Sequence, residues 1–136
     1  MHTHITSASP PFARWFGWAV FLGILQDWAV GLPGIFVPNA VLKVAKADRA
    51  AQPVWPAFAS LLLVLLSLFY IPGALDPYRF RPNAILAVAA RAAGVVFFLG
   101  IWRGRTPAWF GYLDLTFTAL QGSLLWLTLK RRETTQ

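Results

Sequence analysis

The sequence predicts an all-α fold: a four-transmembrane-helix antiparallel bundle with a short interfacial helix after the first span. Hydrophobic residues make up 57% of the 136 residues and charged residues only 12%, whereas a soluble domain carries about 25% charged residues. The apolar residues also cluster in blocks of about 20, the length that crosses a bilayer as a helix. We therefore expect one membrane domain over 15–129, between a flexible leader at 1–14 and a basic tail at 130–136.

The first span runs from Trp15 to about Phe36, after a polar leader that ends at Pro10-Pro11. It contains Gln26 and Asp27 and has no clean small-residue cleavage site after it, so we expect a retained helix rather than a signal peptide. The GLPG segment at 31–34 predicts the end of this helix or a kink in it.

A short amphipathic pattern follows the first span. Apolar residues recur at helical spacing with charged residues between them, as Val37, Val41, Val44 and Ala45 alternate with Lys43, Lys46, Asp48 and Arg49. This pattern favours a helix that lies in the membrane interface. A solvated loop is the alternative.

Prolines and polar turns delimit the other spans. The second span covers 54–71, and we expect Tyr70 and Pro72 to close it. The polar turn at 73–83 begins with Asp76-Pro77, and Asn83 is a candidate cap for the third span at 84–102. The RGRTP turn at 103–107 is so short that the third span and the fourth, at 108–129, must form an antiparallel hairpin.

The distribution of basic residues predicts the orientation in the membrane. With four spans, the leader, the 73–83 turn and the tail share one face, which holds six basic residues against five on the other. The positive-inside rule therefore places both termini on the cytoplasmic face, by a narrow margin that leaves a dual topology open. We expect a multi-pass membrane protein.

The composition argues against several functional classes. The chain has no cysteine, and its only histidines are His2 and His4 in the leader, so the spans offer no thiolate, haem or copper ligands. We therefore expect no metal site and no cofactor. The net charge of +7 is spread over loops and tail, which suits anionic headgroups and gives no nucleic-acid patch.

Polar residues inside the spans are the candidate site, because a charge in hydrocarbon is costly and faces the bundle interior. The first span offers Gln26 and Asp27, and the third offers Arg91. The fourth carries Asp114, Thr118 and Gln121 at spacings of four and three, which form one helical stripe. We predict a ligand or ion-pair site made of Gln26, Asp27, Arg91, Asp114, Thr118 and Gln121.

The depth of these residues allows them to meet. At about 1.5 Å per residue, Arg91 lies about 12 Å, Asp27 about 18 Å and Asp114 about 21 Å from the leader side. We expect Arg91 to pair with Asp114, with Asp27 and Gln121 close by. The alternative is that Arg91 leans toward its own N-terminus and snorkels to the leader face, toward Asp76.

The arrangement resembles the DoxX-like family of small bacterial four-helix membrane proteins. The likeness is carried by YIPGALDPYRFRP after the second span, by Arg91 with Gly94, by Asp114 in YLDLTF, and by the element at 36–39. This resemblance implies an inner-membrane protein, in some members an accessory subunit of a quinone-linked oxidoreductase. It implies no catalytic residues.

We therefore expect a non-catalytic subunit or binding module in the lipid bilayer, which holds a partner protein or an amphipathic ligand such as a quinone or lipid. Homo-oligomers and larger membrane complexes are both compatible with this role. The alternative is a small proton-coupled multidrug-type transporter that uses Asp27 or Asp114, because three converging charges would leave one carboxylate without a cation. A lipid or sterol isomerase has thinner support, since such enzymes need several carboxylates or histidines at one level.

Overall fold

The computed structural model describes residues 11–133, and every regular element in that range is helical. The elements are α1 (Pro11–Phe36), α2 (Pro38–Val44), α3 (Val54–Leu68), α4 (Tyr70–Leu75), α5 (Arg81–Val95), the π-helical segment η1 (Val96–Ile101) and α6 (Ala108–Glu133). The expected all-α fold is confirmed. Residues 1–10 of the predicted leader, with His2 and His4, and residues 134–136 of the predicted tail lie outside the described residues.

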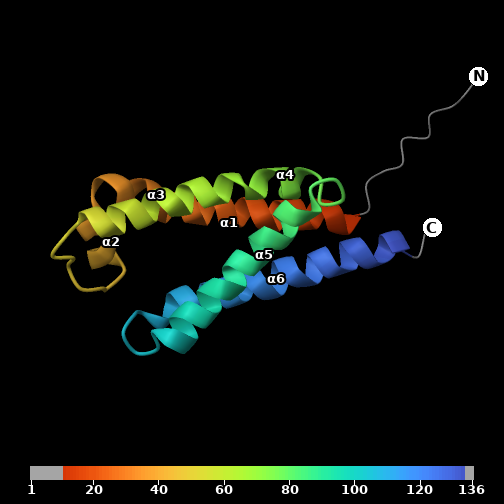
Figure 1. Cartoon of the computed structure of the whole chain (residues 1–136). Coiled ribbons are helices and arrows are strands. Elements are labelled where there is room, and N and C mark those ends of the chain that lie inside the picture. Colours follow the sequence, from red (N-terminus) through yellow and green to blue (C-terminus); the bar gives the residue numbers. More distant parts are fainter. Residues whose placement is uncertain (1–10, 134–136) are drawn as a thin grey trace, which may run out of the picture.

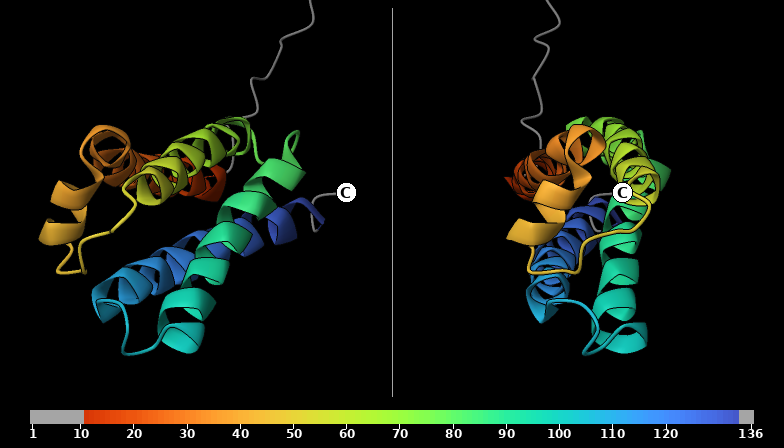
Figure 2. Two further views of the ribbon diagram at one scale, coloured as in Figure 1. Left: turned by 60° about the vertical axis from the view of Figure 1, so that its left-hand side comes forward. Right: turned by 90° about the vertical axis from the view of Figure 1, so that its left-hand side faces the viewer.

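The helices form two pairs that meet along α1. One pair is α1 with the stretch made of α3 and α4, and the other is the stretch made of α5 and η1 with α6. Helix α1 also packs on α6, and α4 packs on α5, so these contacts join the pairs. Figures 1 and 2 show that the pairs lie close together near the start of α1 and diverge toward α2. At the close end, the Arg131 guanidinium lies 4.5 Å from the Phe12 ring centroid, so α6 ends beside the start of α1.

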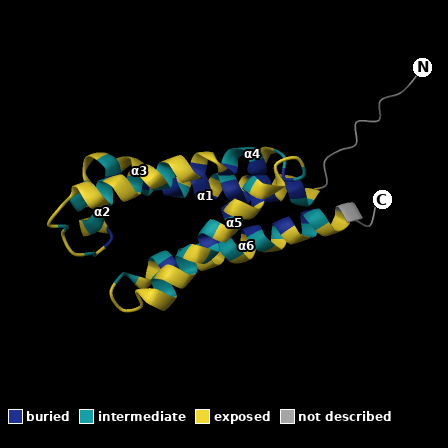
Figure 3. Ribbon diagram, in the orientation of Figure 1, coloured by how far each residue is buried: buried dark blue, intermediate teal, exposed yellow. Residues whose placement is uncertain are grey.

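The core lies where the two pairs meet. Its buried members come from four helices: Phe16, Val20, Ile24, Tyr70, Ala74, Ala84, Ala87 and Leu125. Small residues allow this close approach, since a Cβ on Gly73 would lie 2.8 Å from the Ala84 Cα. Figure 3 shows the buried residues gathered in this half, while the diverging ends are mostly exposed or intermediate. The interior is therefore densely packed at one end only.

Three helical stretches in the described range are long and apolar enough to cross a bilayer, namely Pro11–Phe36, Val54–Leu75 and Arg81–Ile101. Large apolar side chains cover their outer faces; Trp18, Leu22 and Leu25 on α1 are each more than half exposed. Helix α6 is equally long, but it carries Asp114 and Gln121 and is not among these stretches. The structure is that of a membrane protein with three candidate spans, and a fourth span is not confirmed.

Two boundary predictions around the second span are wrong. The helix does not close at Tyr70 and Pro72, because α4 carries it on to Leu75 after a break at Phe69. Nor does Asn83 cap the next helix, which begins at Arg81. The Asn83 side-chain amide instead donates a 2.7 Å hydrogen bond to the Phe69 carbonyl at the break. The Asn83 side chain therefore bonds the carbonyl at the break instead of capping α5.

The ends of the bundle also differ from the predicted ranges. Helix α1 begins at Pro11, so residues 11–14 of the predicted leader are helical, and α6 continues past Leu129 to Glu133. Pro33 lies within α1, which continues through GLPG to Phe36. Proline and glycine are tolerated there because Gly31 and Gly34 pack against α3 at Ser60 and Val64.

Candidate functional site

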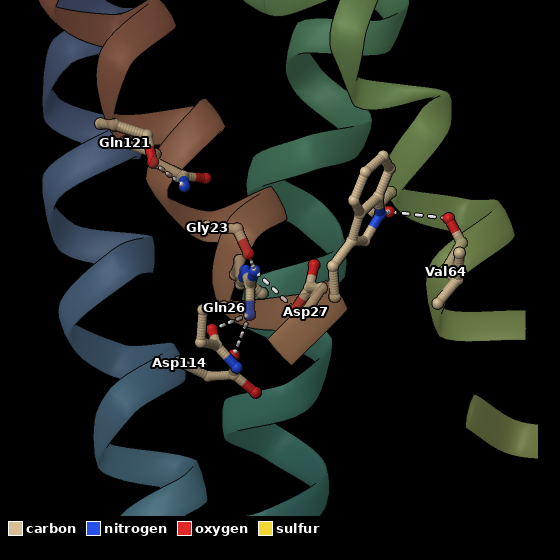
Figure 4. Close-up of polar contacts among 10 residues, drawn as sticks. Gly23, Gln26, Asp27, Val64, Asp114 and Gln121 are labelled. Atoms are coloured by element: carbon tan, nitrogen blue, oxygen red, sulfur yellow. Dashed lines mark hydrogen bonds and ion pairs between the residues drawn. The ribbon is translucent and has the colours of Figure 1, made fainter. Parts of the chain in front are cut away.

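Arg91 lies inside the bundle, at the junction of α1, α5 and α6. It is 7% exposed, and its guanidinium makes four short contacts. Nη2 lies 2.8 Å from Oδ1 of Asp27 and donates a 2.8 Å hydrogen bond to the Gly23 carbonyl. Nη1 donates to Oδ1 of Asp114 at 3.0 Å and to Oε1 of Gln26 at 2.9 Å. Figure 4 shows these groups converging from α1 and α6 on one point.

The predicted pair between Arg91 and Asp114 is therefore present, and the snorkelling alternative is wrong. Arg91 reaches the Asp114 carboxylate, which lies against Gly94 one turn further along α5. The same guanidinium meets Asp27 on α1 at 2.8 Å. These contacts hold Arg91 between the helices and away from the leader face. Asp76 instead accepts the backbone N–H groups of Tyr78 and Arg79 at 3.0 Å.

Gly94 lies one helical turn after Arg91 on α5 and makes room for the Asp114 carboxylate. A Cβ at position 94 would clash with Oδ2 of Asp114 and lie 2.9 Å from its Cγ. The carboxylate therefore rests on bare backbone, from which Oδ1 reaches Nη1 of Arg91. We call Asp27, Arg91 and Asp114 the ion cluster. Any larger residue at position 94 would displace one of its members.

Phe117 completes the surroundings of the guanidinium. Its ring centroid lies 5.0 Å from Cζ of Arg91, within the range of a cation–π contact. Sequence reasoning missed this residue, although it follows Asp114 by three positions and so shares the polar stripe of α6. The carbonyl of Gly23 was missed as well, because a backbone acceptor leaves no trace in the sequence pattern.

Two of the predicted site residues make no bond to the ion cluster. Gln121 is 2% exposed, and its Nε2 donates to the Ala19 carbonyl at 3.1 Å. No described group bonds the buried Oε1 of Gln121 or the buried hydroxyl of Thr118. Figure 4 shows Gln121 further along α6 than Asp114. The structure thus brings together four predicted residues, Gln26, Asp27, Arg91 and Asp114, and leaves these two beside them.

A cavity of about 330 Å³ lies above the cluster, in the wedge between the diverging helix pairs. Gln26, Asp27, Arg91 and Asp114 form its polar floor. The walls are mainly apolar and come from most of the helices, including Val30, Leu63, Phe98, Phe110 and Leu113. Ligand sites are commonly apolar cavities of about 300–1,000 Å³ with a few converging polar groups. This cavity has that character.

Two local features shape the cavity. The π-helical turn η1 places Phe98 in one wall, and such turns are frequent at functional sites. Helix α2 and the residues after it contribute Val41, Leu42, Ala45 and Ala47 at the end away from the core. The segment predicted as an interfacial helix is therefore helical over Pro38–Val44 and borders the cavity.

A second hollow, of about 690 Å³, lies at the opposite end between the start of α1 and the 74–78 turn. Its lining includes Arg14, Trp18 and Tyr78 but none of the ion cluster. Among residues 11–133, no group of three histidine, cysteine, aspartate or glutamate side chains is placed to hold a metal ion. The cavity above Arg91 is therefore the better candidate site.

No family model, no curated protein and no solved structure matches the chain.

Proposed function

We propose that the chain is a four-span integral membrane protein in which α6 is the fourth span. Helix α6 packs against α5 and α1, and its 26 residues extend about 39 Å at 1.5 Å per residue. It runs from the short turn after Ile101 back to the start of α1, where Arg131 meets Phe12. A helix that returns alongside a spanning helix over this length crosses the same thickness of membrane.

We further propose that this membrane is a bacterial inner membrane and that both termini face the cytoplasm. The margin of six basic residues to five supports the orientation. Membership of the DoxX-like family is part of this proposal and rests on the motifs quoted above. Reporter fusions at Gln136 and within 45–50 test the topology. We expect the two sites on opposite faces, with Gln136 cytoplasmic; both on one face would exclude four spans.

Within this topology, the protein acts as a non-catalytic binding module that holds an amphipathic ligand between its helices. The observation that carries this proposal is the cavity, whose apolar walls end on a buried ion cluster. An apolar body fits the walls and a polar head fits the floor, which is the division found in quinones and in lipid head regions. The four partners of Arg91 hold the guanidinium in place, which suits a fixed polar floor.

Mass spectrometry after purification in mild detergent tests this function. We expect a small amphipathic molecule to remain with the wild-type protein and to be lost when Ala47→Phe fills the cavity end. Ala93→Phe, on an exposed position of α5, is the matched control and should retain the molecule. Wild-type protein that carries neither ligand nor partner contradicts the proposal.

A proton-coupled transporter is the second candidate, because the two carboxylates of the floor outnumber the one guanidinium. Transport needs access from both faces, whereas Phe16, Val20 and Ile24 fill the half of the bundle beyond Arg91. A binding role needs only the one entrance. Cationic dye uptake into proteoliposomes under a pH gradient separates the two: uptake favours the transporter, and its absence favours the binding module.

A further inference from the structure

We propose that the ligand of this cavity is an organic cation, with an ammonium head on the carboxylates of Asp27 and Asp114 and an apolar body along the walls. This inference rests on the proposed binding function and specifies its ligand. The inference follows from three properties of the floor: its donors, its free acceptors and its net charge.

The guanidinium donors of the floor are used within the protein, and the Gln26 amide, which bonds Arg91 through Oε1, remains as a neutral donor. Both terminal nitrogens of Arg91 are bonded, Nη1 to Asp114 and Gln26 and Nη2 to Asp27 and Gly23. A guanidinium has five N–H groups and no acceptor, and four contacts occupy most of them. A ligand anion or carbonyl would have to displace one of these bonds, so Arg91 is a poor partner for it.

The acceptors of the floor remain available. Asp27 and Asp114 each contact Arg91 through Oδ1, and within residues 11–133 no hydrogen bond is made to the second oxygen of either carboxylate. Asp27 is 2% exposed and still lines the cavity. Neither second oxygen is among the buried side-chain atoms that lack a partner in the described range, so both keep accessible surface, and a ligand that brings N–H groups finds free acceptors there.

The charge of the floor points the same way. Among residues 11–133, Asp27, Arg91 and Asp114 are the only charged residues that line the cavity, and two carboxylates with one guanidinium leave one formal negative charge. Unbalanced charge in a membrane interior is unfavourable, and one monovalent cation would balance it. The apolar walls and the volume of about 330 Å³ suit an organic molecule rather than a bare metal ion.

Binding of 2-phenylethylamine, compared with its neutral analogue 2-phenylethanol, tests the proposal by calorimetry in detergent micelles. We expect the amine to bind and the alcohol to bind at least ten-fold more weakly. Asp27→Asn and Asp114→Asn each remove the surplus charge while keeping an acceptor for Arg91, so each should weaken amine binding at least ten-fold. The double variant should abolish it. Asp48→Asn, an exposed position outside the cavity, changes the net charge equally and should leave binding unchanged.

A free amine and an ethanolamine lipid head share this chemistry, and nanodiscs separate the two sources. Retention of phosphatidylethanolamine over phosphatidylcholine, lost in the double variant, assigns the lipid head; amine binding without this preference assigns a free amine. Equal binding of amine and alcohol, or amine binding unchanged in the double variant, overturns the cation proposal. In that case, loss of alcohol binding in Ala47→Phe would still support the binding function, whereas binding of neither probe, with no retained ligand, contradicts both.

Discussion

Replacing Arg91 should destabilise the protein far more than replacing either aspartate. Arg91→Met removes four contacts at once and leaves the carboxylates of Asp27 and Asp114 together without a cation. At the membrane average of about 0.6 kcal/mol for each interhelical hydrogen bond, the loss is about 2 kcal/mol. Breaking a buried ion pair from one side costs about 3–5 kcal/mol. We therefore expect a loss of about 2–5 kcal/mol.

The aspartate variants should behave differently because Arg91 forms ion pairs with two aspartates. Asp114→Leu leaves Arg91 paired with Asp27 at 2.8 Å, so one cation still faces one anion. We expect it to cost about 1 kcal/mol, the value of one hydrogen bond. Combining it with Arg91→Met still leaves Asp27 unpaired and should recover little. The triple variant, with Asp27→Leu added, should recover most of the loss, because apolar replacement of a whole buried ion cluster is often close to neutral.

Equilibrium unfolding in mixed micelles of dodecyl maltoside and dodecyl sulfate, followed by far-UV circular dichroism, measures these differences. If the loss of stability in the triple variant equals the sum of the losses in the three single variants, the residues do not interact and the reasoning is refuted. Full recovery in the Arg91→Met/Asp114→Leu double variant would instead exclude Asp27 from the cluster.

Two further predictions use the same unfolding assay. Gly94→Ala should lower stability by about 1–3 kcal/mol, because the added Cβ meets the Asp114 carboxylate. Gly122→Ala is the control: its Cβ has an ordinary nearest contact of 3.6 Å, so it should be neutral or stabilise α6 by up to about 1 kcal/mol. Equal effects of the two substitutions would refute the packing of Asp114 on position 94. Trp28→Phe and Ser67→Ala each remove the 2.7 Å hydrogen bond from the indole to the hydroxyl, so each should cost about 0.5–1.5 kcal/mol and the double variant little more; simple addition would show that this bond contributes nothing.

The parts of the site that the sequence predicted depend on depth and on the cost of buried charge. Asp27, Arg91 and Asp114 are polar groups at similar levels in apolar spans, and the short turn before Ala108 fixes two of their helices side by side. Those constraints are local, so they could be derived from residue spacing. Thr118 and Gln121 share the stripe of Asp114, but Gln121 bonds the Ala19 carbonyl of α1 instead of a member of the cluster.

The cavity and its borders could not be predicted, because they arise from tertiary packing. The divergence of the two helix pairs depends on how closely α4 approaches α5 at Gly73. The π-helical turn at Val96–Ile101 is one extra residue in a helical register, and the apolar sequence there carries no signal for it. Where the second span continues past Pro72, Asn83 bonds the Phe69 carbonyl, a contact between different helices that residue spacing does not reveal.

Thiol labelling tests most directly whether the cavity opens beside the ion cluster. The chain has no cysteine, so single-cysteine variants report one position each. Leu63→Cys lies in the cavity wall, and Leu62→Cys lies on the exposed apolar face of the same helix. In nanodiscs, we expect a small charged methanethiosulfonate reagent to modify Leu63→Cys but not Leu62→Cys, and 2-phenylethylamine to slow that reaction. An inert Leu63→Cys, beside normal labelling of Asp48→Cys in the exposed loop, would contradict an accessible cavity and the binding role built on it.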